Sequence, residues 1–377
     1  MTTALARLEG MLADPAGPAR RWREASGGKV VGWLPPDVPV ELLHAAGALP
    51  FCLLPVDGKG VRLADAHLQT WACSLARCAL EAALAGRLAF LDGLVIPHLC
   101  DTTRLLGGIW RQCAPLPWQE DYLPPRQVDR PSALPYLTGE LKRLGASLGQ
   151  FTGGCIREED LGKSIALYNR QRRLLRTLFQ RQADSPGLLP LRLLYGAVGL
   201  AMRLPPEETN SLLQGVLAEL PPGGGQPGMV RLLASGVTWE PPELLDLLEE
   251  AGATLVADDL QTGRRYFADD AAEGPDPWRA LAEKQLRLMP GCAWDSRARP
   301  RARLLSEAAL KARARGVLFL HLKFCEPENF DYPYLKRALG EAGYPSLLLE
   351  NDLQAPSRGQ LATRLEAFVE LLRGAPA

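Results

Sequence analysis

The sequence predicts an α/β protein built from two units, each with a parallel β-sheet covered by helices. The chain has 377 residues, of which 47% are hydrophobic. It is long for one domain of ~100–200 residues and can bury a large core. Short β-rich runs alternate with helical patterns, which is typical of parallel sheets with helices on both faces. This alternation occurs twice along the chain, without a strict sequence repeat.

The first part of the chain predicts a helical segment followed by the first α/β unit. Residues 3–26 have a helical pattern that is polar on one side. Start and stop signals separate the later elements, such as Gly47 after a helical run. In order, these elements are a strand over 29–34, a helix over 39–47, a strand over 48–54, a helix over 75–88 and a strand over 91–97. The Pro-rich stretch 113–135 is expected to be a loop or linker.

The rest of the chain predicts a helical connection and the second α/β unit. Helical patterns cover 137–178 and the runs LLYGAVGLAMRL and NSLLQGVLAEL. The second unit is expected to contain strands over 229–235, 254–259, 316–322 and 346–350, helices over 242–252 and 331–343, and a closing helix TRLEAFVELLRG. The chain is therefore divided into an N-terminal helical segment (1–28), a first α/β domain (29–136), a helical connection (137–222) and a second α/β domain (223–377).

Charge and composition argue against two classes of partner. Lys plus Arg and Asp plus Glu number 43 each, and there is no long basic tract of the kind that phosphate binding needs. No run reaches the ~18 apolar residues of a membrane span, and the N-terminus lacks the apolar core of a signal peptide. We therefore expect a soluble, cytoplasmic protein with no nucleic-acid partner and no membrane association.

Three cysteines occupy positions where α/β proteins bind ligands. Cys100 follows the strand 91–97, and Cys325 follows the strand 316–322. Ligands of open α/β sheets bind outside the carboxyl ends of the strands. Cys73 precedes a predicted helix, whose terminal N–H groups favour a thiolate. If the two domains face each other across a cleft, the three thiols converge there. The other cysteines carry no motif here, and for Cys52, Cys113, Cys155 and Cys292 we expect core packing.

Three explanations of these thiols are open at this point. The first is three unrelated buried cysteines, since free cysteine is often buried. The second is a loose zinc site, made of His98, Cys100, His321 and Cys325, although the close C-x2-C pairs of structural zinc sites are absent. The third is a [4Fe–4S] cluster, which accepts thiolates dispersed in the sequence. With three thiolates, one iron keeps an open position, which suits chemistry at the cluster.

Segments along almost the whole chain carry a more specific signal than any single motif. They are KVVGWLPPDVPVELLHAAGALP, CSLARCALEAALAGRLAFLDGLVIPHLCDTTRLLGGIW, IALYNRQRRLLRTLF, SGVTWEPPELLDLLEEAGATLVADD, GVLFLHLKFCEPENFDYPYLK and TRLEAFVEL. In these segments and in their order, the chain resembles the cluster subunits of 2-hydroxyacyl-CoA dehydratases and benzoyl-CoA reductases. The resemblance implies two flavodoxin-like α/β domains with helical N-terminal and connecting segments.

The same resemblance implies a cofactor and partners. By position, the family's ligands to a [4Fe–4S] cluster correspond to Cys73, Cys100 and Cys325. The resemblance also implies a homologous cluster-bearing partner in a heterodimer, a separate ATP-hydrolysing activator and an acyl-CoA substrate. In such enzymes a low-potential electron passes to the thioester, to reduce the ring of benzoyl-CoA or to form the ketyl that loses the leaving group of a 2-hydroxyacyl-CoA.

Two stretches favour one branch of this family. Chain length, VELLHAAGALPFCLLP and LVIPHLCDTTRLLGGIW resemble the smaller cluster subunit of ATP-dependent benzoyl-CoA reductase. A dehydratase subunit is the alternative, and a non-catalytic structural subunit is a second one. Gln261 stands where some relatives place a cysteine, which argues against a larger, multi-cysteine cluster.

Three histidines are candidate proton donors. His98 and His321 each precede a candidate ligand within four residues. Each is expected either to hydrogen-bond a cluster sulfur or donate a proton, or to be a satisfied, half-buried imidazole. His44 lies near a predicted helix end, where local packing is the stronger explanation.

Overall fold

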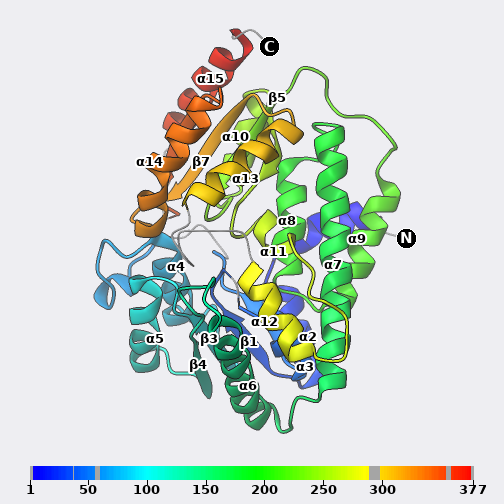
Figure 1. Cartoon of the computed structure of the whole chain (residues 1–377), viewed down its shortest axis with the longest axis vertical. Helices are drawn as coiled ribbons and strands as arrows, with labels where there is room; N and C mark the ends of the chain where they lie inside the picture. The colour runs from blue at the N-terminus through cyan, green and yellow to red at the C-terminus, as the bar shows by residue number, and fades with distance from the viewer. Residues whose placement is uncertain (1–2, 37, 56–59, 288–297, 354–357, 375–377) are drawn as a thin grey trace.

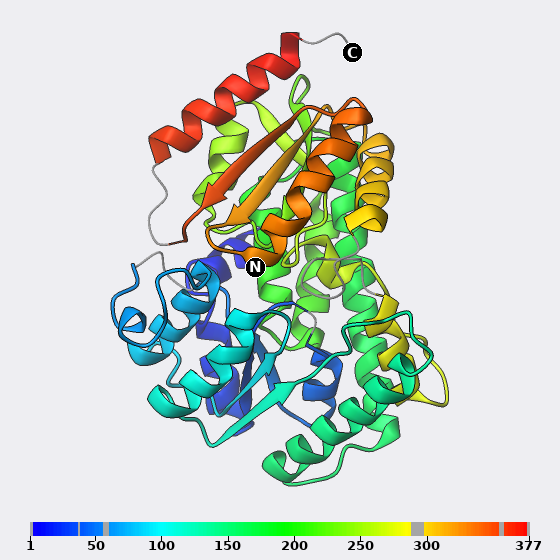
Figure 2. The same cartoon turned by 60° about the vertical axis from the view of Figure 1, so that its left-hand side comes forward.

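Two four-stranded parallel sheets form the framework of the protein, which confirms the predicted fold class. The structure is a computed structural model and describes residues 3–36, 38–55, 60–287, 298–353 and 358–374. The strand orders are β2-β1-β3-β4 and β6-β5-β7-β8. In Figure 2, the orange strand arrows of the second sheet point toward the blue and cyan first unit.

The first sheet is built from short strands, most of which are apolar. Its strands are β1 (Val30–Trp33), β2 (Leu49–Cys52), β3 (Gly93–Pro97) and β4 (Trp118–Tyr122). Helices α3 (Val40–Ala45), α4 (Ser74–Leu84) and α5 (Asp101–Cys113) and the short 3-10 helix η1 (Ala64–Ala66) complete this unit. Every residue of the first three strands is buried, as expected for a parallel sheet covered on both faces.

The strand β4 corrects the expectation of a loop over 113–135. The segment WQEDY pairs with β3 in parallel register, with Gly93 opposite Trp118. Only its two ends, Trp118 and Tyr122, are buried. An edge strand pairs on one side only and tolerates polar residues, so this segment lacks the apolar run that identifies the interior strands.

Helices connect the two sheets. The N-terminal helices are α1 (Ala4–Leu12) and α2 (Gly17–Ser26), and the connection contains α6 (Ala133–Thr152), α7 (Glu158–Asp184), α8 (Leu191–Ala201) and α9 (Pro206–Glu219). The pattern over 137–178 is thus two helices, and the first ends at Gly153 in the left-handed conformation, which glycine adopts without strain. Figure 1 shows α7 running past both units, and it contacts α3 of the first unit and a strand of the second.

The second unit repeats the alternation of strand and helix. Its strands are β5 (Val230–Gly236), β6 (Ala253–Asp258), β7 (Gly316–Leu322) and β8 (Ser346–Asn351). Its helices are α10 (Glu243–Glu250), α11 (Arg264–Phe267), α12 (Pro277–Arg287), α13 (Ala298–Lys311), α14 (Glu326–Glu341) and α15 (Arg358–Gly374). The helix α12 leaves this sheet and packs on α6 and α7.

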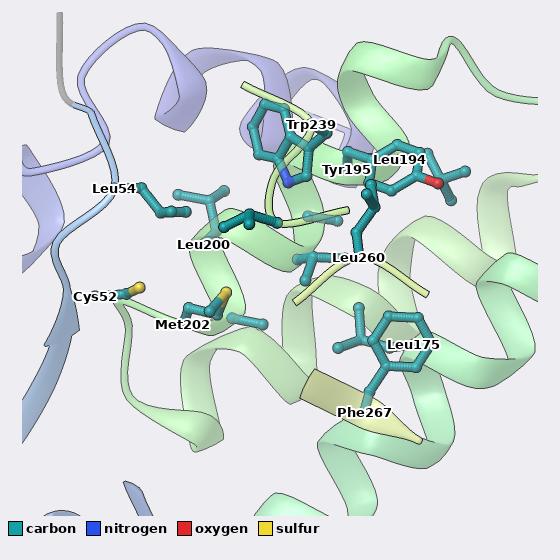
Figure 3. Close-up of a cluster of buried hydrophobic side chains, with 14 of the residues drawn as sticks. Cys52, Leu54, Leu175, Leu194, Tyr195, Leu200, Met202, Trp239, Leu260 and Phe267 are labelled. Atoms are coloured by element: carbon teal, nitrogen blue, oxygen red, sulfur yellow. The ribbon is translucent and has the colours of Figure 1, made fainter. Parts of the chain in front are cut away.

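One hydrophobic core runs continuously from the first sheet to the second. Figure 3 shows the part where the units meet, with side chains from the first sheet, from the helical connection and from the loops of the second unit. They include Cys52, Met202, Trp239, Leu260 and Phe267, each at most 5% exposed. The two sheets are therefore joined by apolar packing, which fixes the ends of their strands relative to each other.

Candidate metal-cofactor site

The three candidate cysteine ligands occupy the same local position in three different helices. Cys73 is the N-cap residue of α4, Cys100 of α5 and Cys325 of α14. The last two follow the carboxyl ends of β3 and β7. An N-cap side chain lies beside the unsatisfied N–H groups of the first helical turn, so it is suited to hold negative charge.

Local hydrogen bonds hold Cys100 at the start of α5. The Thr103 hydroxyl accepts from the N–H groups of Leu99 and Cys100, both at 3.2 Å. The Sγ of Cys100 lies 3.6 Å from the same hydroxyl oxygen. This reciprocal arrangement resembles a capping box, with cysteine and threonine in place of the usual pair. The sulfur is therefore held at the start of the helix.

A strained residue precedes Cys325. Phe324 has a positive φ of 66°, in the left-handed region that costs a residue with a side chain about 1–2 kcal/mol. The backbone turns sharply here, and the Cys325 N–H donates to Leu322 O at 2.9 Å. Such strain persists where surrounding structure enforces it, often at functional sites. The turn brings Cys325 to the N-cap of α14, three residues after the end of β7.

Electrostatics link the three thiols to one another. Burial raises the pKa of Cys73 to about 11 and outweighs the N–H groups of Ala76 and Leu75, which lower it. Burial also raises the pKa of Cys325 well above its usual value. Charge on Cys100 raises the pKa of Cys73, and charge on either of these raises the pKa of Cys325. The expected help from the helix terminus is thus present but smaller than burial. Three neighbouring, partly buried thiolates require a cationic partner, which a metal centre supplies.

The donor set fits a multinuclear cluster better than a single ion. In the described part of the chain, no group of three or more His, Cys, Asp or Glu side chains is assembled to hold one metal ion. This holds for the zinc ligands considered from the sequence and equally for the three cysteines, as ligands of one ion. A [4Fe–4S] cluster binds each thiolate through a different iron, so its ligands stand farther apart than those of one ion. The role of these cysteines as cluster ligands stays a prediction.

A cavity of about 810 Å³ lies beside the three cysteines. Its lining includes sequence neighbours of each one: Ala72, Asp101, Phe324 and Glu326. Its other residues are mainly apolar or aromatic, among them Trp71, Leu105, Ile109 and Phe330. The side chains of Trp71 and Phe330 are 65% and 70% exposed. Large apolar side chains that are exposed around a cavity indicate a binding surface.

The aromatic residues of this cavity are functional candidates that no sequence motif indicates. Trp71 lies two residues before Cys73, and Phe324 directly precedes Cys325. In the sequence, these aromatic residues can be identified by their closeness to the cysteines. The pattern of apolar residues alone does not identify them, because it does not distinguish an exposed aromatic residue from a buried one.

The three candidate histidines have different surroundings. The His98 Nε2 atom lies 3.4 Å from Asp121 Oδ1, at the ends of β3 and β4. The His321 Nδ1 atom lies 3.3 Å from Asn329 Oδ1 on α14, and burial lowers the pKa of His321. These contacts place His98 and His321 beside strand ends that lead to Cys100 and Cys325. None of them tests a role in proton transfer.

His44 packs against the helical connection. Its Nδ1 atom lies 3.0 Å from Ser164 Oγ, and its Nε2 atom lies 3.4 Å from Glu207 Oε1. The ring also packs edge-on against Tyr168, at 5.8 Å between centroids. These three contacts give the His44 ring a structural role, in packing α3 against α7 and α9.

The remaining cysteines differ in burial. Cys52 is buried in the core, as expected, while Cys113 is only partly buried. Cys155 is exposed, so the expectation of core packing is wrong for it; it lies in the short segment between α6 and α7, away from both sheets' interior strands. Cys292 lies outside the described residues.

The fold and the site define an α/β protein with two parallel sheets whose strand ends present thiols at helix starts. A family model described as "2-hydroxyglutaryl-CoA dehydratase, D-component" matches residues 36–372, and the chain belongs to this family. Within the parts of the chain that the structure describes, no helix is both long and apolar enough to cross a membrane.

Curated relatives cover nearly the full chain. The chain is 29% identical over 371 residues to the beta subunit of lactoyl-CoA dehydratase from Anaerotignum propionicum, covering 98% of each chain. It is 29% identical over 355 residues to the C subunit of benzoyl-CoA reductase from Thauera aromatica, covering 92% of each. It is also 29% identical over 360 residues to the beta subunit of (R)-2-hydroxyglutaryl-CoA dehydratase from Acidaminococcus fermentans, covering 93% of this chain and 94% of that one. Relatives of both enzyme types are thus equally similar.

Proposed function

We propose that this chain is a [4Fe–4S]-bearing subunit of an ATP-driven acyl-CoA reductase of the benzoyl-CoA type. The observation that supports this best is the mutual electrostatic influence of Cys73, Cys100 and Cys325, which lie far apart in the sequence. Each caps a different helix, and sequence neighbours of all three line one cavity, which supports a shared site. Full-length similarity to the C subunit of benzoyl-CoA reductase supports the same assignment.

In this proposal the three cysteines hold the cluster, and the rest of the site controls its surroundings. When bound, the cluster supplies a low-potential electron to the acyl-CoA thioester. The N–H groups at the start of α4 favour the Cys73 thiolate, and the backbone of Glu328 does the same for Cys325. Trp71, Leu105 and Phe330 line the cavity with apolar side chains that are exposed in this chain. In this proposal the bound acyl-CoA covers them and displaces water, which protects a reactive radical from side reactions.

His321 and His98 are the proton-handling candidates that best fit this proposal. Burial keeps His321 neutral by lowering its pKa. With Asn329 Oδ1 as acceptor, the proton of the neutral ring lies on Nδ1, and Nε2 is left as the acceptor nitrogen. His44 is the weaker candidate, because Ser164, Tyr168 and Glu207 already surround it.

Partners and location form part of the proposal. The relatives are named as beta or C subunits, so we infer a homologous partner subunit in a cytoplasmic heterodimer. An ATP-hydrolysing activator and an acyl-CoA substrate complete the system. The four-part division at 28, 136 and 222 is retained as the proposed domain organisation.

A dehydratase is the alternative function, and one observation favours it. The match to the beta subunit of lactoyl-CoA dehydratase covers 98% of both chains, whereas the match to the C subunit of benzoyl-CoA reductase covers 92%. In that case the same cluster and fold serve the radical dehydration of a 2-hydroxyacyl-CoA to an enoyl-CoA.

Metal analysis of the anaerobically prepared chain tests the cofactor. We expect about four irons per chain and a broad visible absorption from thiolate–iron charge transfer. Cys73→Ala, Cys100→Ala and Cys325→Ala should each lose most of the iron. Cys155→Ala is the matched control, because Cys155 is exposed, and it should retain all of it. A colourless wild-type protein with stoichiometric zinc would refute the proposal.

Product analysis separates the candidate activities. The chain is combined with its partner, activator, ATP and a reductant. A cyclic diene formed from benzoyl-CoA supports the reductase, and an enoyl-CoA formed from a 2-hydroxyacyl-CoA without net electron use supports the dehydratase. If turnover survives both Cys100→Ala and Cys325→Ala, the chain is a structural subunit.

A further inference from the structure

Arg301, on α13, is a fully buried cation that the proposed chemistry does not use. Its side chain is 0% exposed. Its Nε donates to Asp259 Oδ2 at 2.8 Å, its Nη1 to Asp331 Oδ2 at 3.1 Å, and its Nη2 to Glu328 Oε2 at 3.0 Å. The same Nη2 also donates to Ser235 Oγ at 3.2 Å. One guanidinium thus binds four side chains in a dry environment.

These four partners lie on three separate elements. Ser235 belongs to β5, and Asp259 directly follows β6. Glu328 and Asp331 lie three residues apart in the first turns of α14, where side chains at this spacing share a face. Only the planar fork of arginine supplies several donors in fixed directions at once. Arg301 therefore ties the carboxyl ends of two strands to the helix that begins after Cys325.

Two arginines, Arg301 and Arg265, between them pair with the three carboxylates of this cluster. The buried carboxylates are Asp259, Glu328 and Asp331, and Arg265 donates to Asp259 Oδ2 at 2.9 Å. Glu328 lies one turn from Cys325, and its carboxylate is fully buried against Arg301, with 3.0 Å between Nη2 and Oε2. Without Arg301, three buried carboxylates share a single cation.

The first turn of α14 also shapes the cavity. Phe324, Glu326, Asn329 and Phe330 line it, and Asn329 contacts His321. A shift of this turn displaces the cysteine and the cavity wall together. Arg301 itself does not line the cavity, so its influence passes through Glu328 and Asp331.

We propose that Arg301 is a positioning residue: it fixes the first turn of α14, and with it Cys325, and it balances the charge of Glu328 beside the group bound there. The positioning part stands on the contacts of the protein alone. The charge-balancing part rests on the proposed function, because it concerns a bound cluster.

Hydrogen exchange of the cluster-free chain tests the positioning part. In Arg301→Gln, the amides of residues 326–331, apart from Pro327, which has no N–H, should exchange at least about tenfold faster than in the wild type. Arg303→Gln is the matched control, because it removes the same charge from the same helix, but Arg303 is 83% exposed and pairs with Glu307. Unchanged exchange at 326–331 in a folded Arg301→Gln protein overturns the positioning role.

A conservative variant covers the case in which Arg301→Gln does not fold. Arg301→Lys keeps the charge but not the fork. It should fold, and it should still exchange faster at 326–331 than wild type. Exchange equal to wild type in Arg301→Lys would mean that charge alone suffices, which contradicts positioning by the guanidinium.

Potentiometry of the cluster-loaded chain at pH 8 tests the charge balance. Loss of a nearby cation disfavours reduction, so Arg301→Gln should shift the reduction equilibrium by about tenfold, or ~59 mV to more negative potential for one electron. Adding Glu328→Gln in the same chain should return the potential toward wild type. Equal potentials in wild type and Arg301→Gln overturn the charge-balancing role. A wild-type chain that binds no cluster refutes the proposed function and with it the charge-balancing role, and the exchange result still decides the positioning role.

Discussion

Replacing Glu41 with glutamine should destabilise the protein by several kcal/mol at neutral pH. Glu41 lies fully buried on α3. Its Oε1 accepts from Lys284 Nζ at 2.9 Å and pairs with Arg172, and both partners are buried as well. One carboxylate thus joins the first unit, α7 and α12. Glutamine keeps the shape of the side chain but leaves two buried cations without their counter-ion.

The magnitude follows from the pKa of this carboxyl group. Burial alone would raise the pKa of Glu41, but Arg172 and Lys284 lower it to about 2, from an ordinary value of 4.5. Since one pKa unit corresponds to 1.36 kcal/mol, the ionised carboxylate contributes about 3 kcal/mol to folding at neutral pH. Removing one partner of a buried ion pair independently suggests about 3–5 kcal/mol.

The pH dependence gives the sign of the effect. A carboxyl group whose pKa is lower in the folded than in the unfolded chain stabilises the fold above the unfolded pKa. This contribution is lost as the pH falls from about 4.5 toward 2. Glutamine does not titrate, so the difference in stability between wild type and Glu41→Gln should be largest at pH 7 and should narrow below pH 4.5.

Urea titrations at several pH values measure this difference. Glu159→Gln is the control, because Glu159 lies on α7 in an exposed pair with Lys163, and such pairs contribute about 0–1 kcal/mol. If Glu41→Gln is as stable as Glu159→Gln at pH 7, the buried pair does not stabilise the fold. A difference that stays constant from pH 7 to pH 2.5 would likewise refute the electrostatic explanation.

Two further substitutions test single features of the second unit. Burial raises the pKa of Glu240 to about 7 from 4.5, so the stability of the wild type falls as the pH rises from 4.5 to 7. In urea titrations, Glu240→Gln should be as stable as the wild type at pH 4 and more stable by up to about 3 kcal/mol at pH 8. Equal stabilities at pH 8 would contradict this explanation. Gly236 has a φ of 148°, and an added Cβ would overlap the carbonyl oxygen of Leu320, so Gly236→Ala should lose at least about 3 kcal/mol. Gly27→Ala is the control, because Gly27 has a φ of 66° and open space where the Cβ would lie; it should lose only about 1–2 kcal/mol of stability. Similar thermal midpoints for the two variants would refute the predicted clash at Gly236.

The sequence reveals elements whose local pattern matches their final environment. The strand β7 is one apolar run and is buried throughout, so its period and position were predictable. The helix α14 is predicted over 331–343 but begins at Glu326. Its first turns contain Pro327, and Pro333 lies inside it. Proline normally ends or starts a helix, so the sequence pattern did not indicate that α14 begins directly after Cys325.

The positions of Cys100 and Cys325 after strand ends were predictable, whereas the burial of Arg301 was not. Cys100 and Cys325 follow strands, and one topological rule brings such residues to the same edge of a sheet. Arg301 and Arg303 lie two residues apart in a charged helix, yet the first is fully buried and the second is 83% exposed. This difference depends on Asp259, Glu328 and Ser235, which come from distant segments, so no local pattern records it.

The position of the candidate ligands also explains how one fold serves two reactions. Each cysteine lies at the start of a helix, just outside the sheets, and residues there change without disturbing the buried strands. Side chains such as Trp71 and Phe330 line the cavity from the same helix starts and loops. Dehydratase and reductase subunits are equally similar to this chain, at 29% identity. Since function depends on the site and not on the fold, we expect the two branches to differ in the walls of this cavity.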